Sequence, residues 1–501
     1  MKMRSLLTCI ALLSSFAWSA PATKEITRLD TFAKRDLAAS LATKLSSDAS
    51  VLFPQSKHWE NITERWDKYL PPTFQAAVQV ATEEDIVSVI KYAVSQNLSF
   101  FTQGGGHGFS PLNTVQNAIM INMRQLNQVN VDAHTGIATV GGGIVYEEVI
   151  NASYAAGREI TVGSCPCAGL LGASLGGGIG RLQGLHGLTQ DAIRRLRVVL
   201  GNGDVINVSE NEHSDLWWGM RGAGHNFGVV VEAEFQTAPQ ASAGQFYNVD
   251  ITYADAKLEQ VLELMNKQIV NQPAELAIEI IFAANPTTLK EQPVIAVNIV
   301  YAGTQSAGQK WSSPWKQLGP LTFTEDSYNW AELPFKSEGG MKSGDCLNYG
   351  YKDIYSANLK FFDPPTMRSI YTSFGKLIAA NPNANASSII FEVYSQEGVR
   401  SSPDNGSAFP NRSHFNVLAL IFGWWTDTAI TYTVDTWLAN AQSAMNKTSG
   451  YDKQYIYQNY AKSEIVQSYY GYEPWRLERL KSLKEKYDPK ALFSGYHPIP
   501  V

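Results

Sequence analysis

The sequence contains few cysteines and no long run of charge of one sign. Its 4 cysteines among 501 residues are too few to hold a fold together by disulfides. A formal net charge of -6 gives no electrostatic reason to expect a nucleic acid as partner. Beyond the N-terminus, no apolar stretch is long enough to span a bilayer. What remains is a large chain with 44% hydrophobic residues, which is enough for two or more domains.

Several cofactor and metal motifs are missing as well. The chain has no G-x-G-x-x-G dinucleotide fingerprint, no nucleotide loop of the form G-x-x-x-x-G-K-S/T and no zinc motif H-E-x-x-H, and we expect no metal site. Residues 172–176 fit the nucleophile elbow of serine hydrolases, but they lack the preceding strand and following helix that an elbow needs. We treat this match as accidental and keep a hydrolase as a distant alternative.

The N-terminus has the three parts of a secretory signal. Positive charge at residues 1–4 precedes a mostly apolar stretch at 6–18, and small residues follow at Ser19 and Ala20. This order predicts a signal peptide at residues 1–20 and a secretory-pathway or extracellular location. We therefore expect a glycoprotein in which several sequons carry glycans. The sequons lie at Asn61, Asn97, Asn151, Asn207, Asn385, Asn405, Asn411 and Asn446.

The number of cysteines is odd once the signal peptide, with Cys9, has been removed. Cys165, Cys167 and Cys346 remain. In an oxidising compartment an odd number requires an explanation. Either one thiol is free, or one cysteine is bonded to something other than sulfur.

The pattern of apolar residues predicts an α+β protein in two main parts. Between residues 66 and 237, strands, short helices and glycine turns alternate, and Thr82–Asp85 has the form of a capping box that starts a helix. Small residues at 238–244 mark a boundary. The later part predicts an antiparallel sheet flanked by helices. Its clearest strands are Val294–Tyr301, Ile389–Tyr394 and Val417–Phe422.

Three runs of glycine lie in the first part, at residues 104–108, 141–143 and 176–180. Glycine allows the backbone to approach a ligand closely and to direct several N–H groups at phosphate oxygens. A single run would be better explained as a turn. Three runs within one predicted domain favour a large phosphorylated cofactor.

From about Trp66 onward the sequence resembles the FAD-linked oxidoreductases of the vanillyl-alcohol oxidase type, and among them the berberine-bridge-enzyme-like (BBE-like) group. The segments that carry the resemblance are Thr102–His107, Gly163–Pro166, Leu188–Asp191, Gly201–Asp204, Asp215–Gly224, Asn226–Val230, Phe409–Arg412 and Tyr457–Tyr460. The resemblance implies an FAD-binding PCMH-type domain at 66–239, a substrate domain at 240–430 and a C-terminal segment at 431–501 that completes the active site.

The resemblance also implies how the cofactor is held. His107 and Cys165 match the two positions that bond covalently to FAD, which would account for the odd cysteine. Gln103 stands where the family usually has Arg, and Cys167 either pairs with Cys346 or both are thiols. The other residues implied to contact the cofactor are Gly104, Gly105, Gly106, Gly108, Gly169, Gly172, Gly176, Gly177 and Asn459.

For the reaction, the resemblance implies hydride transfer from a small molecule to FAD and reoxidation by molecular oxygen, with hydrogen peroxide as product. Tyr457 matches the tyrosine proposed as catalytic base. Relatives often place Glu or Gln near the position of Leu418, and an apolar residue there favours a hydrophobic specialised metabolite, such as a polyketide, terpenoid or alkaloid intermediate. A secreted carbohydrate oxidase and a flavin-dependent cyclase without net redox turnover are the alternatives.

Overall fold

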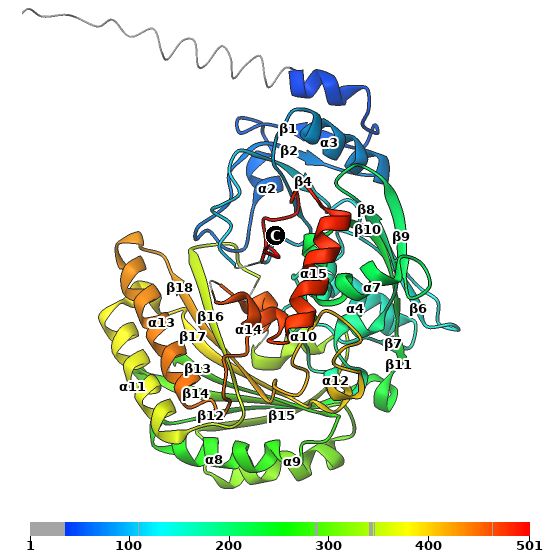
Figure 1. Cartoon of the computed structure of the whole chain (residues 1–501). Helices are drawn as coiled ribbons and strands as arrows, with labels where there is room; N and C mark the ends of the chain where they lie inside the picture. The colour runs from blue at the N-terminus through cyan, green and yellow to red at the C-terminus, as the bar shows by residue number, and fades with distance from the viewer. Residues whose placement is uncertain are drawn as a thin grey trace, which may run out of the picture. The chain divides into compact units, whose positions relative to one another are not determined.

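The computed structural model describes residues 36–108, 110–285, 289–339, 344, 346–462 and 464–500. The signal peptide predicted at residues 1–20 lies outside them. The chain divides into two units, of which the first ends at Thr43 and the second runs from Lys44 to Val501. Residues 36–42 of the first unit are helical. The sheets described below all belong to the second unit (Figure 1).

The first sheet of this unit has four strands in the order β1-β2-β4-β3. They are β1 (Ser50–Leu52), β2 (Phe74–Gln79), β3 (Phe100–Gln103) and β4 (Ala118–Asn122). β4 is buried along its whole length and pairs in parallel with both β2 and β3. Helix α3 (Glu83–Ser95) begins at the predicted capping box, in which Thr82 and Asp85 each accept a backbone hydrogen bond from the other.

The second sheet has five antiparallel strands in the order β5-β6-β10-β8-β9. They are β5 (Val129–Val131), β6 (Ile137–Gly141), β8 (Ile193–Val199), β9 (Val205–Ser209) and β10 (Val229–Gln236). Alternate residues of the central strand β10, such as Ala233 and Phe235, are buried in one core cluster. The same cluster includes residues from the covering helices α4 (Tyr146–Ala155), α5 (Leu170–Leu175) and α7 (Ser214–Ala223).

The third sheet confirms the antiparallel sheet predicted for the later part. Its seven strands follow the order β15-β12-β14-β13-β17-β18-β16, and every neighbouring pair is antiparallel. They are β12 (Gln245–Tyr253), β13 (Leu276–Asn285), β14 (Leu289–Tyr301), β15 (Thr322–Asn329), β16 (Tyr351–Leu359), β17 (Ser388–Tyr394) and β18 (Val417–Trp425). The three strands predicted from the sequence lie within β14, β17 and β18.

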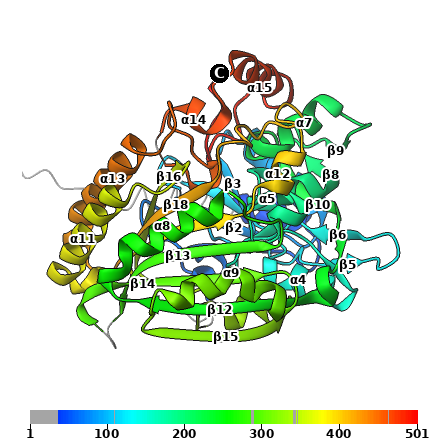
Figure 2. The same ribbon diagram turned by 90° about the horizontal axis from the view of Figure 1, so that it is seen from below.

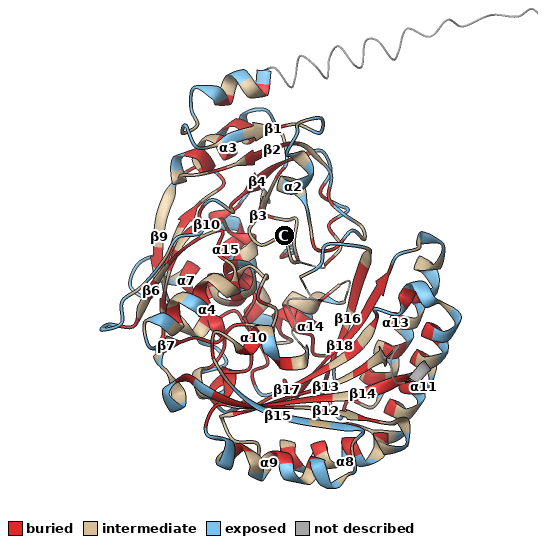
Figure 3. Cartoon of the chain, turned by 180° about the vertical axis from the view of Figure 1, so that it is seen from behind, coloured by how far each residue is buried: buried red, intermediate tan, exposed pale blue. Residues whose placement is uncertain are grey.

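Four helices cover one face of this sheet (Figures 1 and 2). They are α8 (Leu258–Ile269), α9 (Gln305–Gln317), α11 (Pro364–Ala380) and α13 (Thr431–Lys447). One core cluster joins Leu262 of α8, Trp315 of α9, Phe374 of α11 and Leu438 of α13 to the strands. Figure 3 shows the strands as mostly buried and these helices with exposed residues on their outer side. The opposite face of the sheet is therefore left for the cavity described below.

The end of the chain contacts both parts of the second unit. Asn358 of β16 donates a hydrogen bond to the Tyr455 carbonyl (3.0 Å). Farther on, α15 (Pro474–Tyr487) packs against α7, and Lys484 of α15 is fully buried, donating to the Asn226 carbonyl (2.8 Å). No helix in the described part of the chain is long and apolar enough to cross a membrane.

Candidate active site

A cavity of about 470 Å³ lies where the glycine-rich loops face the uncovered side of the seven-stranded sheet. One wall is formed by residues of the 104–108 and 163–172 loops, and the other by residues of β16, β17 and β18. Residues near the end of the chain, among them Phe493 and Tyr496, also line it. The cavity therefore brings together segments that are up to about 430 residues apart, from Arg65 to Tyr496.

The glycine-rich loops approach each other too closely to carry side chains. A Cβ atom built on Gly105 would lie 2.6 Å from the backbone nitrogen of Gly169, and one on Gly169 would lie 2.9 Å from the nitrogen of Gly105. Gly106 has a φ of +68°, which L side chains rarely adopt. These loops expose backbone to the cavity, as the approach of a large phosphorylated ligand requires. The predicted cofactor glycines that line the cavity are Gly104, Gly105, Gly106, Gly108, Gly169 and Gly172.

Gly176 and Gly177 have a different place from the one predicted. They are not among the residues that line the cavity. A Cβ atom on Gly176 would collide with the side chain of Asn459, and one on Gly177 would lie 2.6 Å from the Phe409 ring and 3.1 Å from the Tyr457 ring. These two glycines leave room for the side chains that reach the cavity, so their role is to position Asn459 and Tyr457.

Gln103, which stands in place of the expected Arg, is buried and lines the cavity. Its Nε2 donates a hydrogen bond to the Glu64 carbonyl (3.0 Å), and its Oε1 has no hydrogen-bond partner among the described residues. A guanidinium offers only donors, whereas this amide oxygen is an acceptor. The substitution therefore changes the kind of hydrogen bond that a ligand can make here.

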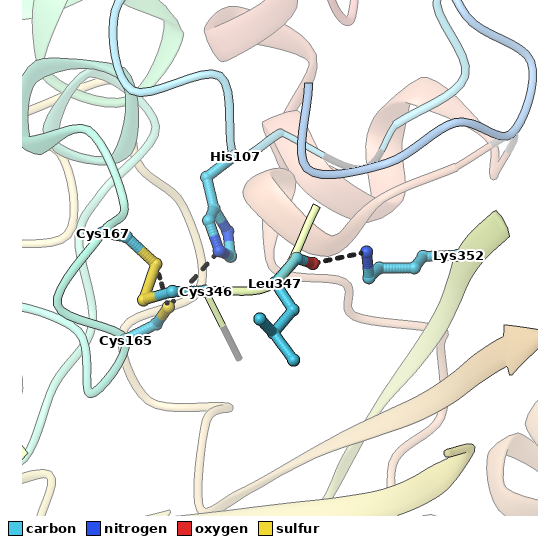
Figure 4. Close-up of a disulfide and its surroundings, with 6 residues drawn as sticks. All are labelled: His107, Cys165, Cys167, Cys346, Leu347 and Lys352. Carbon is cyan, nitrogen blue, oxygen red and sulfur yellow. Dashed lines mark hydrogen bonds between the residues drawn. A yellow bond between two sulfur atoms is a disulfide. The ribbon is translucent and has the colours of Figure 1, made fainter. Parts of the chain in front are cut away.

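The predicted attachment residues His107 and Cys165 lie side by side at the cavity (Figure 4). Cys165 Sγ is 3.3 Å from His107 Nε2 and 3.2 Å from Cys167 Sγ. Cys167 forms a disulfide with Cys346, so the pairing left open by the sequence is present. His107, Cys165 and Cys167 are close enough to ligate a metal ion, but a disulfide sulfur is no thiolate ligand.

His225 is a polar cavity residue that no motif in the sequence predicted. Its Nε2 is 2.7 Å from the Gly172 carbonyl and must donate to it, which makes Nδ1 the acceptor in the neutral ring. Burial lowers the pKa of His225 to about 4, so the ring is neutral near pH 7. Nδ1 is buried without a hydrogen-bond partner among the described residues. Such unsatisfied acceptors, next to glycine loops, fit an amphipathic cofactor such as FAD.

Tyr457 lies at the cavity with its hydroxyl held from two directions. Its oxygen accepts hydrogen bonds from the Gly178 N–H (2.9 Å) and from Asn459 Nδ2 (2.7 Å). Burial raises the pKa of this phenol well above its usual value, although both hydrogen bonds act in the opposite direction. Tyr457 is therefore protonated near neutral pH, and neither of these two bonds uses its own hydrogen.

Glu392 is a cavity residue that the sequence reasoning missed. It lies on β17 opposite Leu418 of β18, and its Oε1 is 3.4 Å from the Tyr394 hydroxyl and 3.5 Å from the Tyr460 hydroxyl. Burial, followed by repulsion from Glu279, raises the pKa of Glu392 to about 8. A lone Glu inside the apolar run of β17 was the available signal, because an unpaired carboxyl is seldom placed in a buried strand.

A buried ion pair supports the floor of the cavity near Glu392. Arg181 is 3.1 Å from Glu279 and 2.5 Å from Glu338, and all three side chains are mostly buried. Arg181 also donates a hydrogen bond to Asn298 Oδ1 (3.2 Å). Glu279 and Glu338 also line the cavity. The ion pair therefore places carboxylate oxygens at the end of the cavity where Glu392 lies.

The other strand residues that line this wall are mainly apolar, and Leu418, to which the sequence pointed, is not among them. Leu418 is buried in the same cluster as the lining residues Phe422 and Trp424, and Leu420, two residues farther along β18, lines the cavity. Alternate residues of a strand share a face, so Leu418 and Leu420 lie on the same side of the sheet, one two-residue repeat apart. The apolar lining residues of the three strands are Ile354, Ile390, Leu420, Phe422 and Trp424.

The predicted glycosylation sites differ in exposure. Asn411 is buried, with 6% of its surface exposed, and a glycan has no room there. Asn207 and Asn446 are partly buried. The exposed sequon residues are Asn61, Asn97, Asn151, Asn385 and Asn405.

Comparison with known proteins identifies similar chains of nearly the same length. Residues 74–209 match the family model described as an FAD binding domain. The FAD-linked oxidoreductase anuG of Penicillium roqueforti is 33% identical over 468 residues, which cover 93% of this chain and 92% of the relative. The FAD-linked oxidoreductase srdI of Neurospora crassa is 33% identical over 503 residues, covering 99% and 98%.

Solved structures share the fold at lower identity. Chitooligosaccharide oxidase superposes with a TM-score of 0.79 at 22% identity, covering 92% of this chain and 99% of its own. The BBE-like 1 protein of Physcomitrella patens superposes with a TM-score of 0.80 at 20% identity, covering 93% and 99%. The expected α+β fold with an FAD-binding domain is thus confirmed.

Proposed function

The chain belongs to the BBE-like FAD-linked oxidoreductases with a PCMH-type FAD-binding domain, and from this premise we propose that it oxidises a small, mainly apolar metabolite. Molecular oxygen is the proposed final electron acceptor and hydrogen peroxide the product. The observation that carries the proposal is the sheet wall of the cavity, in which five apolar side chains outnumber the polar ones, Ser388, Glu392 and the neighbouring Glu279. A sugar would leave most of its hydroxyl groups unpaired against such a wall.

FAD fits the residues on the opposite wall. Backbone of the 104–108 and 163–172 loops would hold its phosphates and ring, and His107 and Cys165 are the proposed points of covalent attachment. Their mutual distance of 3.3 Å supports attachment at neighbouring positions of one ring system. Bound FAD supplies the acceptor for a hydride from the substrate. The chain itself has to orient the substrate, exclude water and remove a proton.

Tyr457 is the proposed residue that takes the substrate proton at Oη. Since burial keeps this phenol protonated near neutral pH, it can accept a proton only as its own proton leaves. Glu392 is the carboxyl group of this cavity that lies next to Tyr460, and we propose that it receives this proton. Tyr460 packs on Tyr457, with 4.9 Å between ring centroids, and its hydroxyl lies 3.5 Å from Glu392 Oε1. The carboxylate form of Glu392 is thus the proposed final proton acceptor.

The test of the proposed function is anaerobic bleaching of the bound flavin by a panel of compounds. We expect aromatic or terpenoid alcohols and amines to bleach it, and air to restore the colour with release of hydrogen peroxide. Bleaching by oligosaccharides alone would replace the proposal by the second candidate, a carbohydrate oxidase, which the fold of chitooligosaccharide oxidase favours. Conversion of a substrate without peroxide would indicate a cyclase.

We further propose that the protein enters the secretory pathway, as its N-terminal sequence predicts. Five exposed sequon residues support this, because glycans need an accessible asparagine. Endoglycosidase treatment is expected to lower the apparent mass, and N-terminal sequencing is expected to begin near residue 21. An intact Met1 on the mature, unglycosylated protein would contradict the proposal.

A further inference from the structure

Three cysteine sulfurs meet beside the proposed cofactor site, and their chemistry is not accounted for by cofactor binding alone. Cys167 and Cys346 form a disulfide, while Cys165 is not part of it. Cys165 Sγ lies 3.2 Å from Cys167 Sγ, within contact distance of the bonded sulfur (Figure 4). A thiol in contact with a disulfide sulfur has the placement from which thiol–disulfide exchange begins.

The thiol also has a proton acceptor next to it. His107 Nε2 is 3.3 Å from Cys165 Sγ, which is within hydrogen-bonding distance for sulfur. The thiolate, and not the thiol, is the attacking species in exchange, and a neighbouring imidazole promotes its formation. Cys165 therefore has both a base, His107, and a target sulfur, that of Cys167, within contact distance.

The backbone holds the attacking and attacked sulfurs together. The Pro166 carbonyl accepts a hydrogen bond from the Glu147 N–H (2.8 Å), and the Ala168 carbonyl accepts one from the Tyr146 N–H (3.0 Å). Both donors belong to the first turn of α4, so the Cys165–Ala168 loop is fixed on a helix end. The contact between the two sulfurs is thus part of a supported loop conformation.

The segment that carries Cys346 is held independently of the disulfide. Lys352 is fully buried and its Nζ donates hydrogen bonds to the carbonyls of Leu347 (3.0 Å) and Tyr349 (2.9 Å). The same ammonium lies over the rings of Trp66 and Trp424, at 4.5 and 4.4 Å from their centroids. If the disulfide opens, Cys346 therefore stays close to Cys167, and the opening is reversible.

We propose that Cys165, Cys167 and Cys346 form an exchange triad that competes with flavin for Cys165. In the step, the Cys165 thiol gives its proton to His107 and its sulfur attacks Cys167 Sγ. The Cys165–Cys167 bond forms as the Cys167–Cys346 bond breaks, and Cys346 leaves as a thiolate that takes up a proton. One disulfide and one thiol are present before and after, so no oxidant or reductant is consumed.

Flavin attachment would also control the disulfide exchange. This inference rests on the proposed bond between FAD and Cys165. A flavin-bonded sulfur cannot attack Cys167, so attachment fixes the disulfide on Cys346. A chain in which Cys165 has already paired with Cys167 cannot accept the second flavin bond. The three sulfurs thus make loading of the cofactor sensitive to thiol chemistry.

Two variants that both remove the native disulfide test the triad. Cys346→Ser leaves Cys165 and Cys167 together, whereas Cys167→Ser removes the sulfur that lies 3.2 Å from Cys165 and leaves Cys346. The full chain is produced in the presence of oxidised glutathione. Each glutathione disulfide that oxidises Cys165 and Cys167 to a disulfide is itself reduced to two glutathione thiols. Peptides are then mapped without reduction. Because both variants lose the same bond, any general effect on folding is shared, and flavin on the His107 peptide marks folded chain.

For Cys346→Ser we expect a Cys165–Cys167 disulfide and at least about tenfold less flavin on the Cys165 peptide than for Cys167→Ser. Equal flavin on the Cys165 peptide of both variants, with no Cys165–Cys167 disulfide, would overturn the triad. If wild type itself carries no flavin on that peptide, the proposed attachment fails instead, and the disulfide map still decides the triad.

A direct test follows exchange in wild type made under riboflavin limitation. N-ethylmaleimide at about pH 8, where thiolates form more readily, is expected to label Cys346 progressively. Cys165→Ser, which lacks the attacking sulfur but keeps the native disulfide, is expected to show at least about tenfold less label on Cys346. Absence of label on Cys346 of wild type would contradict the exchange.

Discussion

The two walls of the cavity are built in different ways. On the glycine-loop side, backbone meets backbone, and a single added carbon on Gly105 would lie 2.6 Å from the nitrogen of Gly169. On the sheet side, side chains from β16, β17 and β18 form the surface. The backbone wall therefore leaves little room for side chains to vary, whereas the side chains of the sheet wall can be replaced while the strands stay in place.

The largest effect, on flavin content, is expected when a side chain is added to a glycine of the backbone wall. Gly105→Ala places its Cβ against the fixed backbone of Gly169, and because overpacking of this kind costs about 1–3 kcal/mol or more, we expect flavin content to fall about tenfold or further. Gly104→Ala is the matched control, since its Cβ would meet only the Gly142 carbonyl, at an ordinary 3.5 Å. The ratio of flavin to protein absorbance measures both. Full flavin content in Gly105→Ala would show that the loops can move apart.

The next effect separates chemistry from binding. Tyr457→Phe removes the hydroxyl and leaves the ring packing, so flavin content is expected to stay at the wild-type level. Loss of a general base lowers rates by about 10² to 10⁴. Anaerobic stopped-flow should find this loss in flavin reduction by substrate, while reoxidation by oxygen is nearly unchanged. Equal rates of flavin reduction in both proteins would show that Tyr457 only packs against its neighbours.

A smaller and pH-dependent effect is expected at Glu392. Its raised pKa of about 8 means that the proton-accepting carboxylate is gained as pH rises, so wild-type flavin reduction should increase through about pH 8. Glu392→Gln keeps the shape without the ionisation, and its profile should be flat and lower above that pH. Rate against pH for both proteins checks this. A rise of the same size in Glu392→Gln would assign the ionisation to another group.

The smallest effect is expected on the apolar part of the sheet wall. Leu420→Ala removes buried contact area that a hydrophobic substrate would use, which is worth about 1 kcal/mol and corresponds to a KM raised about fivefold. The rate of flavin reduction at saturating substrate should stay close to wild type. Steady-state kinetics separates the two quantities, and an unchanged KM would place the substrate elsewhere in the cavity.

The same contrast explains what the sequence could predict. Glycine runs and their flanking motifs are local signals, because a backbone that approaches a ligand allows few other residues. The 104–108 and 163–172 loops, which line the cavity, could therefore be selected from the sequence. Strand positions were also predicted, since the alternation along β10 and the apolar runs of β14 and β18 follow from which faces are buried.

The contents of the sheet wall were harder to predict because they depend on where the cavity meets the strands. Leu418 and Leu420 share a face of β18, and which of them lines the cavity depends on how far the cavity extends along the strand, which a sequence alone does not supply. Glu392 reaches the site from β17, and the Cys167–Cys346 pair joins positions 179 residues apart. Gly176 and Gly177 were assigned to the cofactor because a glycine that makes room for Tyr457 looks the same in a sequence as one that contacts a ligand.

The late position of several cavity residues has a consequence for how the protein is made. Leu492, Phe493 and Tyr496 line the cavity together with the loop that carries His107. Lys484 holds this last stretch by donating to the Phe493 carbonyl (3.0 Å), and the Ile499 N–H donates to Asn226 Oδ1 (2.9 Å). While these residues are still inside the ribosome, the loop near residue 107 has no finished pocket beside it. We therefore expect cofactor capture to follow translation, however early the glycine loops emerge.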